Sequence, residues 1–139
     1  INGSIYMRTT RPGSATYGRL YYSEKARNGF LKAANSLLQF KLNHCINKEQ
    51  KVFINQPVVQ FTILFLISLE DLNYLKHYSQ LFNTLKKGPL NILETEGCSD
   101  FYKKMGKYYN YSIHYFYLNW IFFRLRKSLG IKLSKILSY

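Results

Sequence analysis

Apolar residues recur with the period of an α-helix in three segments of the chain. The first covers about 23–43 and begins with Ser23, a residue that favours helix starts. The second covers about 69–87 and ends in a lysine pair, a glycine and a proline, which together stop a helix. The third covers about 112–129, and Gly130 is expected to bend or break it. These patterns predict three helices.

A period of two appears between the first two helical segments. From Val59 to Leu69 every odd-numbered residue is apolar, whereas the even-numbered positions are mixed. This alternation predicts a long strand near 52–67 with one face fully buried and the other partly buried. A second strand is possible near 90–95. Three helices with one or two strands around a small single core predict an α+β fold.

The stretch from Val52 to Leu69 is also the longest uncharged run of the chain. A helix that crosses a membrane needs about 20 predominantly apolar residues. Here polar residues and a proline interrupt the run, so a strand is favoured over a membrane helix. A helix in this stretch would instead favour a membrane-bound protein. The interrupting residues are Asn55, Gln56, Pro57, Gln60 and Thr62.

The net charge of +13 is distributed unevenly along the 139 residues. Residues 1–32 have a net charge of +5, residues 33–100 are neutral, and residues 101–139 carry eight basic residues and no acidic one. Segregated positive charge is typical of proteins that bind a polyanion. The chain is therefore predicted to comprise an extended basic arm (1–22), a neutral compact core (23–100) and an aromatic-basic helical tail (101–139) packed on the core.

No feature of the sequence predicts catalysis, so we expect no enzymatic activity, no cofactor and no small-molecule substrate. Glycine-rich phosphate-binding motifs do not occur. The histidines His44, His77 and His114 are far apart, and the pair His44-Cys45 lacks a second ligand pair, so no metal site is predicted. Cys45 and Cys98 are too few for a disulfide scaffold, and whether they pair is left open.

Basic residues alternate with aromatic residues near both ends of the chain. Lysine and arginine pair with phosphate groups, and exposed tyrosine rings stack on unpaired bases, so this combination suits folded RNA. The sequence therefore predicts RNA binding through three clusters. Their residues are Arg8, Arg11 and Arg19; Lys103, Lys104, Lys107 and Tyr108; and Arg124, Arg126, Lys127, Lys132 and Lys135.

Residue choice points to an organelle gene. Ile, Asn, Lys, Phe and Tyr, all encoded by A/T-rich codons, supply 59 of the 139 residues. Such a bias is typical of organelle genomes and of some parasite nuclear genomes. The chain begins at Ile1, which fits a non-standard start codon, removal of a leader, or a fragment. Together these observations favour a protein encoded in the mitochondrion.

A small core with cationic ends, here residues 1–32 and 101–139, resembles ribosomal proteins in general. The resemblance is one of overall style and includes no motif of a named ribosomal family. It implies a non-catalytic structural subunit that binds and braces ribosomal RNA and contacts neighbouring ribosomal proteins. We therefore expect a mitochondrial ribosomal protein of the matrix.

An accessory, membrane-associated subunit of a mitochondrial respiratory complex is the alternative. The uncharged run 108–123 is rich in Tyr and Trp, which are favoured at the membrane–water interface. The basic residues that follow this run suit anionic headgroups. Polar residues such as Gln60 and His114 within the two apolar runs argue against a full span in the inner membrane. A basic secreted or toxin-like protein is disfavoured by the two cysteines and by the lack of a signal-like segment.

Overall fold

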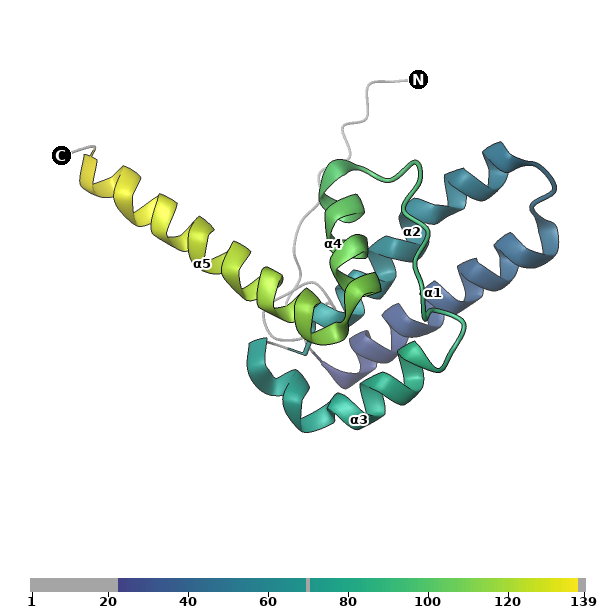
Figure 1. Ribbon diagram of the computed structural model, residues 1–139, viewed down its shortest axis with the longest axis horizontal. Helices are drawn as coiled ribbons and strands as arrows, with labels where there is room; N and C mark the ends of the chain where they lie inside the picture. Colours follow the sequence, from purple (N-terminus) through teal and green to yellow (C-terminus); the bar gives the residue numbers. More distant parts are fainter. Residues whose placement is uncertain (1–22, 70, 138–139) are drawn as a thin grey trace, which may run out of the picture.

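The computed structural model describes residues 23–69 and 71–137, except for the side chains at 71 and 131–137. Over these residues the chain is all-α and contains no strand, so the predicted α+β fold is wrong. Figure 1 shows the arrangement of the helices. They are α1 (Glu24–His44), α2 (Lys48–Ile67), the 3-10 helix η2 (Asp71–His77), α3 (Tyr78–Leu81), the π-helical turn η3 (Phe82–Lys86), α4 (Asp100–Tyr111) and α5 (Ile113–Leu137).

α1 and α2 form an antiparallel hairpin (Figure 1). α1 begins where the Ser23 hydroxyl accepts a hydrogen bond from the Ala26 amide at 3.1 Å, and it matches the predicted helix over 23–43 to within one residue at each end. The Asn47 side chain caps α2 in the same way by accepting from the Gln50 amide at 2.9 Å. Such caps satisfy amides that have no partner within the helix.

The segment predicted as a strand near 52–67 is helical and belongs to α2. Its buried positions recur every three or four residues, but two of them are polar, Asn55 and Thr62, and this concealed the helical period. The Thr62 hydroxyl donates to the Val58 carbonyl at 2.8 Å, so it is buried without loss of a hydrogen bond. Contacts with α1 and α4 thus override the strand preference of the β-branched and aromatic residues.

α2 is also the one helix in the described part of the chain that is long and apolar enough to cross a membrane. Only 39% of its most apolar window is buried inside the protein. A helix in this stretch is what the sequence leads us to expect of a membrane-bound protein, and α2 has the length and composition for it. The core helix of a protein outside the membrane passes the same test, so the packing of α2 has to decide between the two.

The predicted helix over 69–87 is divided into η2, α3 and η3. Ser68, just before this segment, ends α2, and its hydroxyl donates to the Phe65 carbonyl at 2.6 Å. Tyr74, Leu81 and Leu85 are buried at intervals of seven and four residues, the spacing of one helical face. Leu75 and Phe82, which lie between them in the sequence, are left exposed.

The predicted second strand near 90–95 is an irregular loop. Leu90 and Leu93 anchor it because both side chains are buried. The Leu93 amide donates to Asn110 Oδ1 at 2.7 Å, and Asn110 Nδ2 donates to the Leu93 carbonyl at 2.8 Å. One side chain of α4 therefore satisfies both backbone groups that a strand would have paired with a neighbouring strand.

α4 lies in the predicted helical tail over 101–139, although no separate helix was predicted there. It packs closely against α2 and the loop before it. A Cβ atom at Gly106 would lie 2.6 Å from Thr95 Cγ2 and 3.6 Å from Val59 Cγ1. Close approach of the backbone therefore requires glycine here. After Ser112, α5 continues through Gly130 to Leu137, so the predicted helix end near residue 129 is wrong. The second half of α5 extends away from the other helices (Figure 1).

Three aromatic side chains of α4 and α5 lie at the centre of the core: Tyr109, Phe116 and Tyr117 are completely buried. The Tyr109 hydroxyl donates to the Leu90 carbonyl at 2.6 Å, and the Tyr117 hydroxyl donates to the Leu66 carbonyl at 2.5 Å. These bonds satisfy the hydroxyl groups where water is excluded. The aromatic residues after position 100 thus connect α4 and α5 to the remaining elements.

Candidate polyanion-binding surface

The twelve predicted RNA-binding residues divide into those with described side chains and those without. Arg8, Arg11 and Arg19 lie outside the described residues. Lys132 and Lys135 belong to α5, but their side chains are not among those described. Seven residues are left on two consecutive helices: Lys103, Lys104, Lys107 and Tyr108 on α4, and Arg124, Arg126 and Lys127 on α5.

The predicted residues of α4 share its outward arc. Helical spacing sets this arc opposite the buried side chains of Met105 and Tyr109. Lys104 and Lys107 are exposed on it, and Tyr108 is half-buried. Lys104 and Lys107 therefore face away from the core, whereas Tyr108 packs partly against it.

A groove between α4 and α5 brings two of the predicted clusters together. Lys104 and Tyr108 line it from α4, and Arg126 lines it from α5, although Arg126 is 22 residues further along the chain than Lys104. The groove has a volume of about 390 Å³. We call it the α4–α5 groove; its lining residues are Asp100, Phe101, Lys104, Met105, Tyr108, Asn119, Phe122, Phe123 and Arg126.

The other basic residues predicted to bind RNA, where their side chains are described, are not part of this groove. Lys107, Arg124 and Lys127 are exposed but absent from its lining. Lys103 is half-buried, and its ammonium acts on the Cys98 thiol. Burial raises the pKa of the Cys98 thiol, and Lys103 opposes that rise. The two predicted clusters therefore contribute unequally to one site.

Positive charge dominates the α4–α5 groove. Its one acidic residue, Asp100, lies in the first turn of α4, where a carboxylate interacts favourably with the helix dipole. Neither Lys104 nor Arg126 has an ion-pair partner within the described residues, where the ion pairs are Lys41–Glu94 and Lys48–Glu96. The two bases are thus available to an anionic ligand.

Aromatic rings surround the groove and the junction of the two helices. Tyr115 contacts Tyr108 with ring centroids 5.5 Å apart and Tyr111 with centroids 4.7 Å apart. Phe123 contacts Phe101 at 5.7 Å. The phenylalanines of the groove were not predicted as site residues, because each lies outside the basic clusters that gave the sequence signal. Aromatic rings next to lysine and arginine side chains form a surface on which the bases of RNA can stack.

Lys86 is a cation whose role was not apparent from the sequence. Its ammonium donates to the Tyr109 carbonyl at 2.7 Å and to the Asn91 carbonyl at 3.2 Å, and it lies 3.7 Å from the centre of the Tyr109 ring. Burial lowers the pKa of Lys86. A cation near the last carbonyls of α4 complements the negative end of that helix. Lys86 is therefore structural and is not part of the binding surface.

Lys41 is a second structural cation, 5% exposed in α1. Its ammonium donates to Asn55 Oδ1 and to Glu94 Oε2, both at 2.7 Å. Asn55 Nδ2 in turn donates to the Glu96 carbonyl at 3.1 Å. This network joins α1, α2 and the loop before α4, and it explains why Asn55 is buried in an otherwise apolar part of α2.

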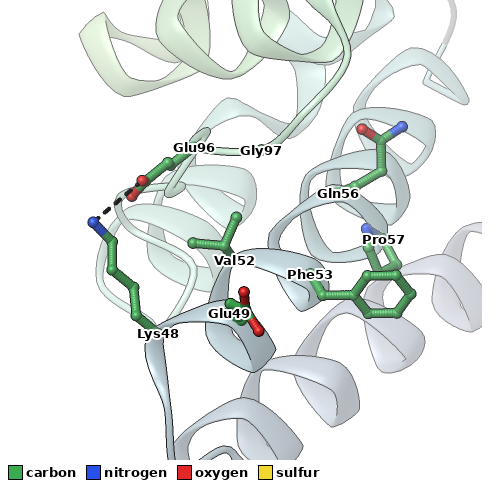
Figure 2. Close-up of a pocket in the computed structure, with 8 residues that line it drawn as sticks. All are labelled: Lys48, Glu49, Val52, Phe53, Gln56, Pro57, Glu96 and Gly97. Atoms are coloured by element: carbon green, nitrogen blue, oxygen red, sulfur yellow. Dashed lines mark ion pairs between the residues drawn. The ribbon is translucent and has the colours of Figure 1, made fainter.

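A larger hollow, of about 650 Å³, lies between α2 and the loop at Gly97 (Figure 2). Lys48 and Glu96 form an ion pair of 3.5 Å across its edge. Gly97 has φ of 81°, and a Cβ there would lie 2.4 Å from Val52 Cγ1, so the turn requires glycine. Two acidic residues and one basic residue line this hollow, so it lacks the net positive charge of the α4–α5 groove.

Neither the histidines nor the cysteines form a ligand cluster in the described part of the chain, where no group of three metal-ligating side chains occurs. Cys45 and Cys98 are both free thiols. His114 is instead part of an aromatic contact: its Nδ1 lies 2.8 Å from the Tyr74 hydroxyl, and its ring stacks on Tyr78 at 4.3 Å. His114 therefore belongs to the aromatic packing of the protein.

No family model, no curated protein and no solved structure matches the chain. What the helices and the groove define is an all-α protein with a basic, aromatic surface on α4 and α5. Arguments about its function therefore rest on the chemistry of that surface.

Proposed function

We propose that the protein is a non-catalytic structural subunit of the mitochondrial ribosome that binds ribosomal RNA through α4 and α5. The observation that supports this proposal most directly is the α4–α5 groove, where Lys104, Tyr108 and Arg126 line one hollow. Cationic groups next to an aromatic ring match the two features of unpaired RNA, its phosphates and its bases. The codon bias of the sequence supports the mitochondrial assignment.

The residues that line the groove can contact both the phosphates and the bases of RNA. Lys104 and Arg126 would each hold a phosphate, and the planar guanidinium of Arg126 allows two parallel hydrogen bonds to it. Tyr108 and the phenylalanines would contact a base that is not paired. The volume of about 390 Å³ falls within the range of roughly 300–1,000 Å³ that ligand pockets occupy.

The alternative proposal is an accessory subunit of a respiratory complex in the inner membrane. A helix over residues 52–69 was expected to favour this alternative, and α2 is such a helix. The packing of α2 weighs against it. The ammonium of Lys41 contacts the middle of α2 at Asn55, and a charge at this depth of a bilayer is costly. We therefore retain the ribosomal proposal and use the membrane alternative as an outcome of the test.

Fractionation of mitochondria tests the assembly directly. Under the ribosomal proposal, the protein should co-migrate with a ribosomal subunit on a density gradient, and nuclease treatment should abolish this co-migration. Mass spectrometry of the fractions would identify the chain by its peptides. Retention in membranes after an alkaline carbonate wash, together with a respiratory complex, would instead support the alternative and refute ribosomal membership.

RNA binding by the groove is tested by the double substitution Lys104→Ala and Arg126→Ala. We expect weaker binding to a single-stranded RNA of about 20 nucleotides, and a salt dependence of log K that is less steep by about 1.4, because each lost phosphate contact contributes about 0.7. Tyr108→Leu should weaken binding by about 1–3 kcal/mol without changing that slope, since stacking releases no counterions. Fluorescence anisotropy between about 50 and 200 mM salt measures both quantities.

The matched control is Lys51→Ala with Lys76→Ala, which removes the same net charge from exposed positions outside α4 and α5. This control should leave the slope close to that of the wild type. Equal losses in the groove variant and the control would show that only total charge matters, and the groove would then be no binding site.

A further inference from the structure

α5 carries an exposed apolar stripe along one side. Leu118, Phe122, Leu125 and Leu129 follow one another at intervals of four, three and four residues, which places them on one face of the helix. Their side chains remain 66%, 67%, 58% and 58% exposed. We refer to these four residues as the apolar stripe. Isolated exposed leucines are ordinary, but a continuous row on one helix marks an interaction surface.

The opposite side of α5 changes character along the helix. In the first half it is apolar and enters the core through Phe116 and Tyr117. In the second half the same side carries Arg124 and Lys127, which helical spacing places in line with those two buried residues. The second half of α5 is therefore amphipathic, with the apolar stripe on one side and basic groups on the other.

Beyond the α4–α5 groove, the second half of α5 is exposed in the described part of the chain. Every residue from 122 to 130 is exposed, and the helix points away from the other elements (Figure 1). Residues 101–139 contain eight bases and no acid, so the partner of this segment has to be anionic. It also has to accept four apolar side chains in a row.

We propose that the second half of α5 binds the surface of an anionic lipid bilayer. The apolar stripe would insert at the boundary between headgroups and acyl chains, and Arg124, Arg126 and Lys127 would contact headgroup phosphates. This is the pattern of helices that lie in the membrane interface, with lysine and arginine on the polar face and Leu or Phe on the other. Binding of this kind requires no preformed recess along α5.

Two other occupants fit the stripe less well. A second copy of the chain would bring another α5 with the same bases and no acid, so like charges would oppose pairing. RNA supplies phosphates and bases but no hydrocarbon for aliphatic side chains. The proposal also goes beyond RNA binding, because Leu118, Leu125 and Leu129 lie outside the α4–α5 groove.

Vesicle sedimentation with the full chain tests the proposal. The wild type should bind vesicles of phosphatidylcholine with about 30% phosphatidylglycerol more tightly than vesicles of phosphatidylcholine alone, since anionic lipid attracts each nearby base. The double substitution Leu125→Ser and Leu129→Ser should reduce binding to the anionic vesicles at least about tenfold. Lys127→Gln should reduce it by roughly fivefold, which corresponds to about 1 kcal/mol per base.

The matched control is Leu72→Ser with Leu75→Ser, which removes two exposed leucines from η2 and should leave vesicle binding unchanged. RNA anisotropy of the Leu125/Leu129 variant should match that of the wild type, so failure of the lipid proposal is distinguishable from failure of the groove. Equal loss in the control, or no binding of wild type to anionic vesicles, would overturn the proposal. So would a wild-type dimer that the Leu125/Leu129 variant loses, because the stripe would then be a contact between copies.

Discussion

Tyr117→Ala is expected to lower the free energy of unfolding by about 3–5 kcal/mol, the usual cost of truncating a large buried aromatic side chain. Tyr117 is completely buried, and its ring stacks on Tyr74 with centroids 3.9 Å apart. Its hydroxyl donates to the Leu66 carbonyl at the end of α2. Truncation would therefore leave a cavity between α5, η2 and α2 and remove one hydrogen bond to that carbonyl, which also accepts from the Leu69 amide at 3.3 Å. Denaturant unfolding followed by circular dichroism measures the loss.

The conservative variant Tyr117→Phe separates the two contributions. It keeps the ring and removes the hydroxyl, so the expected loss is about 0.5–1.5 kcal/mol, the net contribution of one hydrogen bond, because the Leu69 amide still donates to the Leu66 carbonyl. Tyr111→Phe, at an exposed position, serves as a control and should be nearly neutral. If Tyr117→Ala were no more destabilising than Tyr111→Phe, the packing of α5 on η2 would be wrong.

Alkaline pH is expected to unfold the protein through its buried tyrosines. Burial raises the pKa of Tyr109 and of Tyr117 above the ordinary value of 10.0, and Tyr74 adds to the shift at Tyr117. Above pH 10 the unfolded chain loses these phenolic protons while the folded protein keeps them. Stability is therefore fully present below pH 10 and falls as the pH rises, by about 1.4 kcal/mol per pH unit for each tyrosine.

The measurement is the free energy of unfolding at a series of pH values above 9. The double substitution Tyr109→Phe and Tyr117→Phe removes both phenols, so its stability should fall less steeply with pH than that of the wild type, although it starts lower. Tyr111→Phe should leave the slope unchanged. Identical slopes in the double variant and the wild type would mean that these two hydroxyls titrate normally in the folded state.

Local signals in the sequence predicted α1 correctly but led to the wrong prediction of a strand in α2. Ser23 and the apolar period after it located α1, because a cap and an amphipathic face are both properties of a short segment. In α2 the inward positions Asn55 and Thr62 are polar, and Asn55 is buried because Lys41, from another helix, binds it. That partner is 14 residues away, beyond the reach of a local pattern.

α4 escaped prediction as a separate helix for a related reason. Its buried face consists of Met105, Gly106 and Tyr109, and a glycine in the middle of a helix argues against that helix in sequence alone. The reason for a glycine at position 106 is the close approach of the α4 backbone to Thr95, which the sequence does not show. Tertiary contacts here outweigh the intrinsic preference.

The candidate site was predicted in parts. Composition alone indicated that Lys104 and Arg126 belong to basic clusters, but their common groove depends on the turn between α4 and α5. The phenylalanines that complete the groove carry no charge and so gave no signal. The roles of Lys41 and Lys86 could not be predicted either, because Glu94 and Tyr109 are 53 and 23 residues away from them.

The junction of α4 and α5 consists of one residue, Ser112, with an extended backbone of φ −169° and ψ 161°. Its three hydrogen bonds are local: its amide donates to the Tyr108 carbonyl, its hydroxyl accepts from the Tyr115 amide, and its carbonyl accepts from the Phe116 amide. One residue inserted in the first turn of α5, ahead of Phe116, would rotate the rest of that helix by about 100° and shift it by about 1.5 Å. Arg126 would leave the groove, and Phe116 and Tyr117 would leave the core. Insertions and deletions at the start of α5 are therefore excluded.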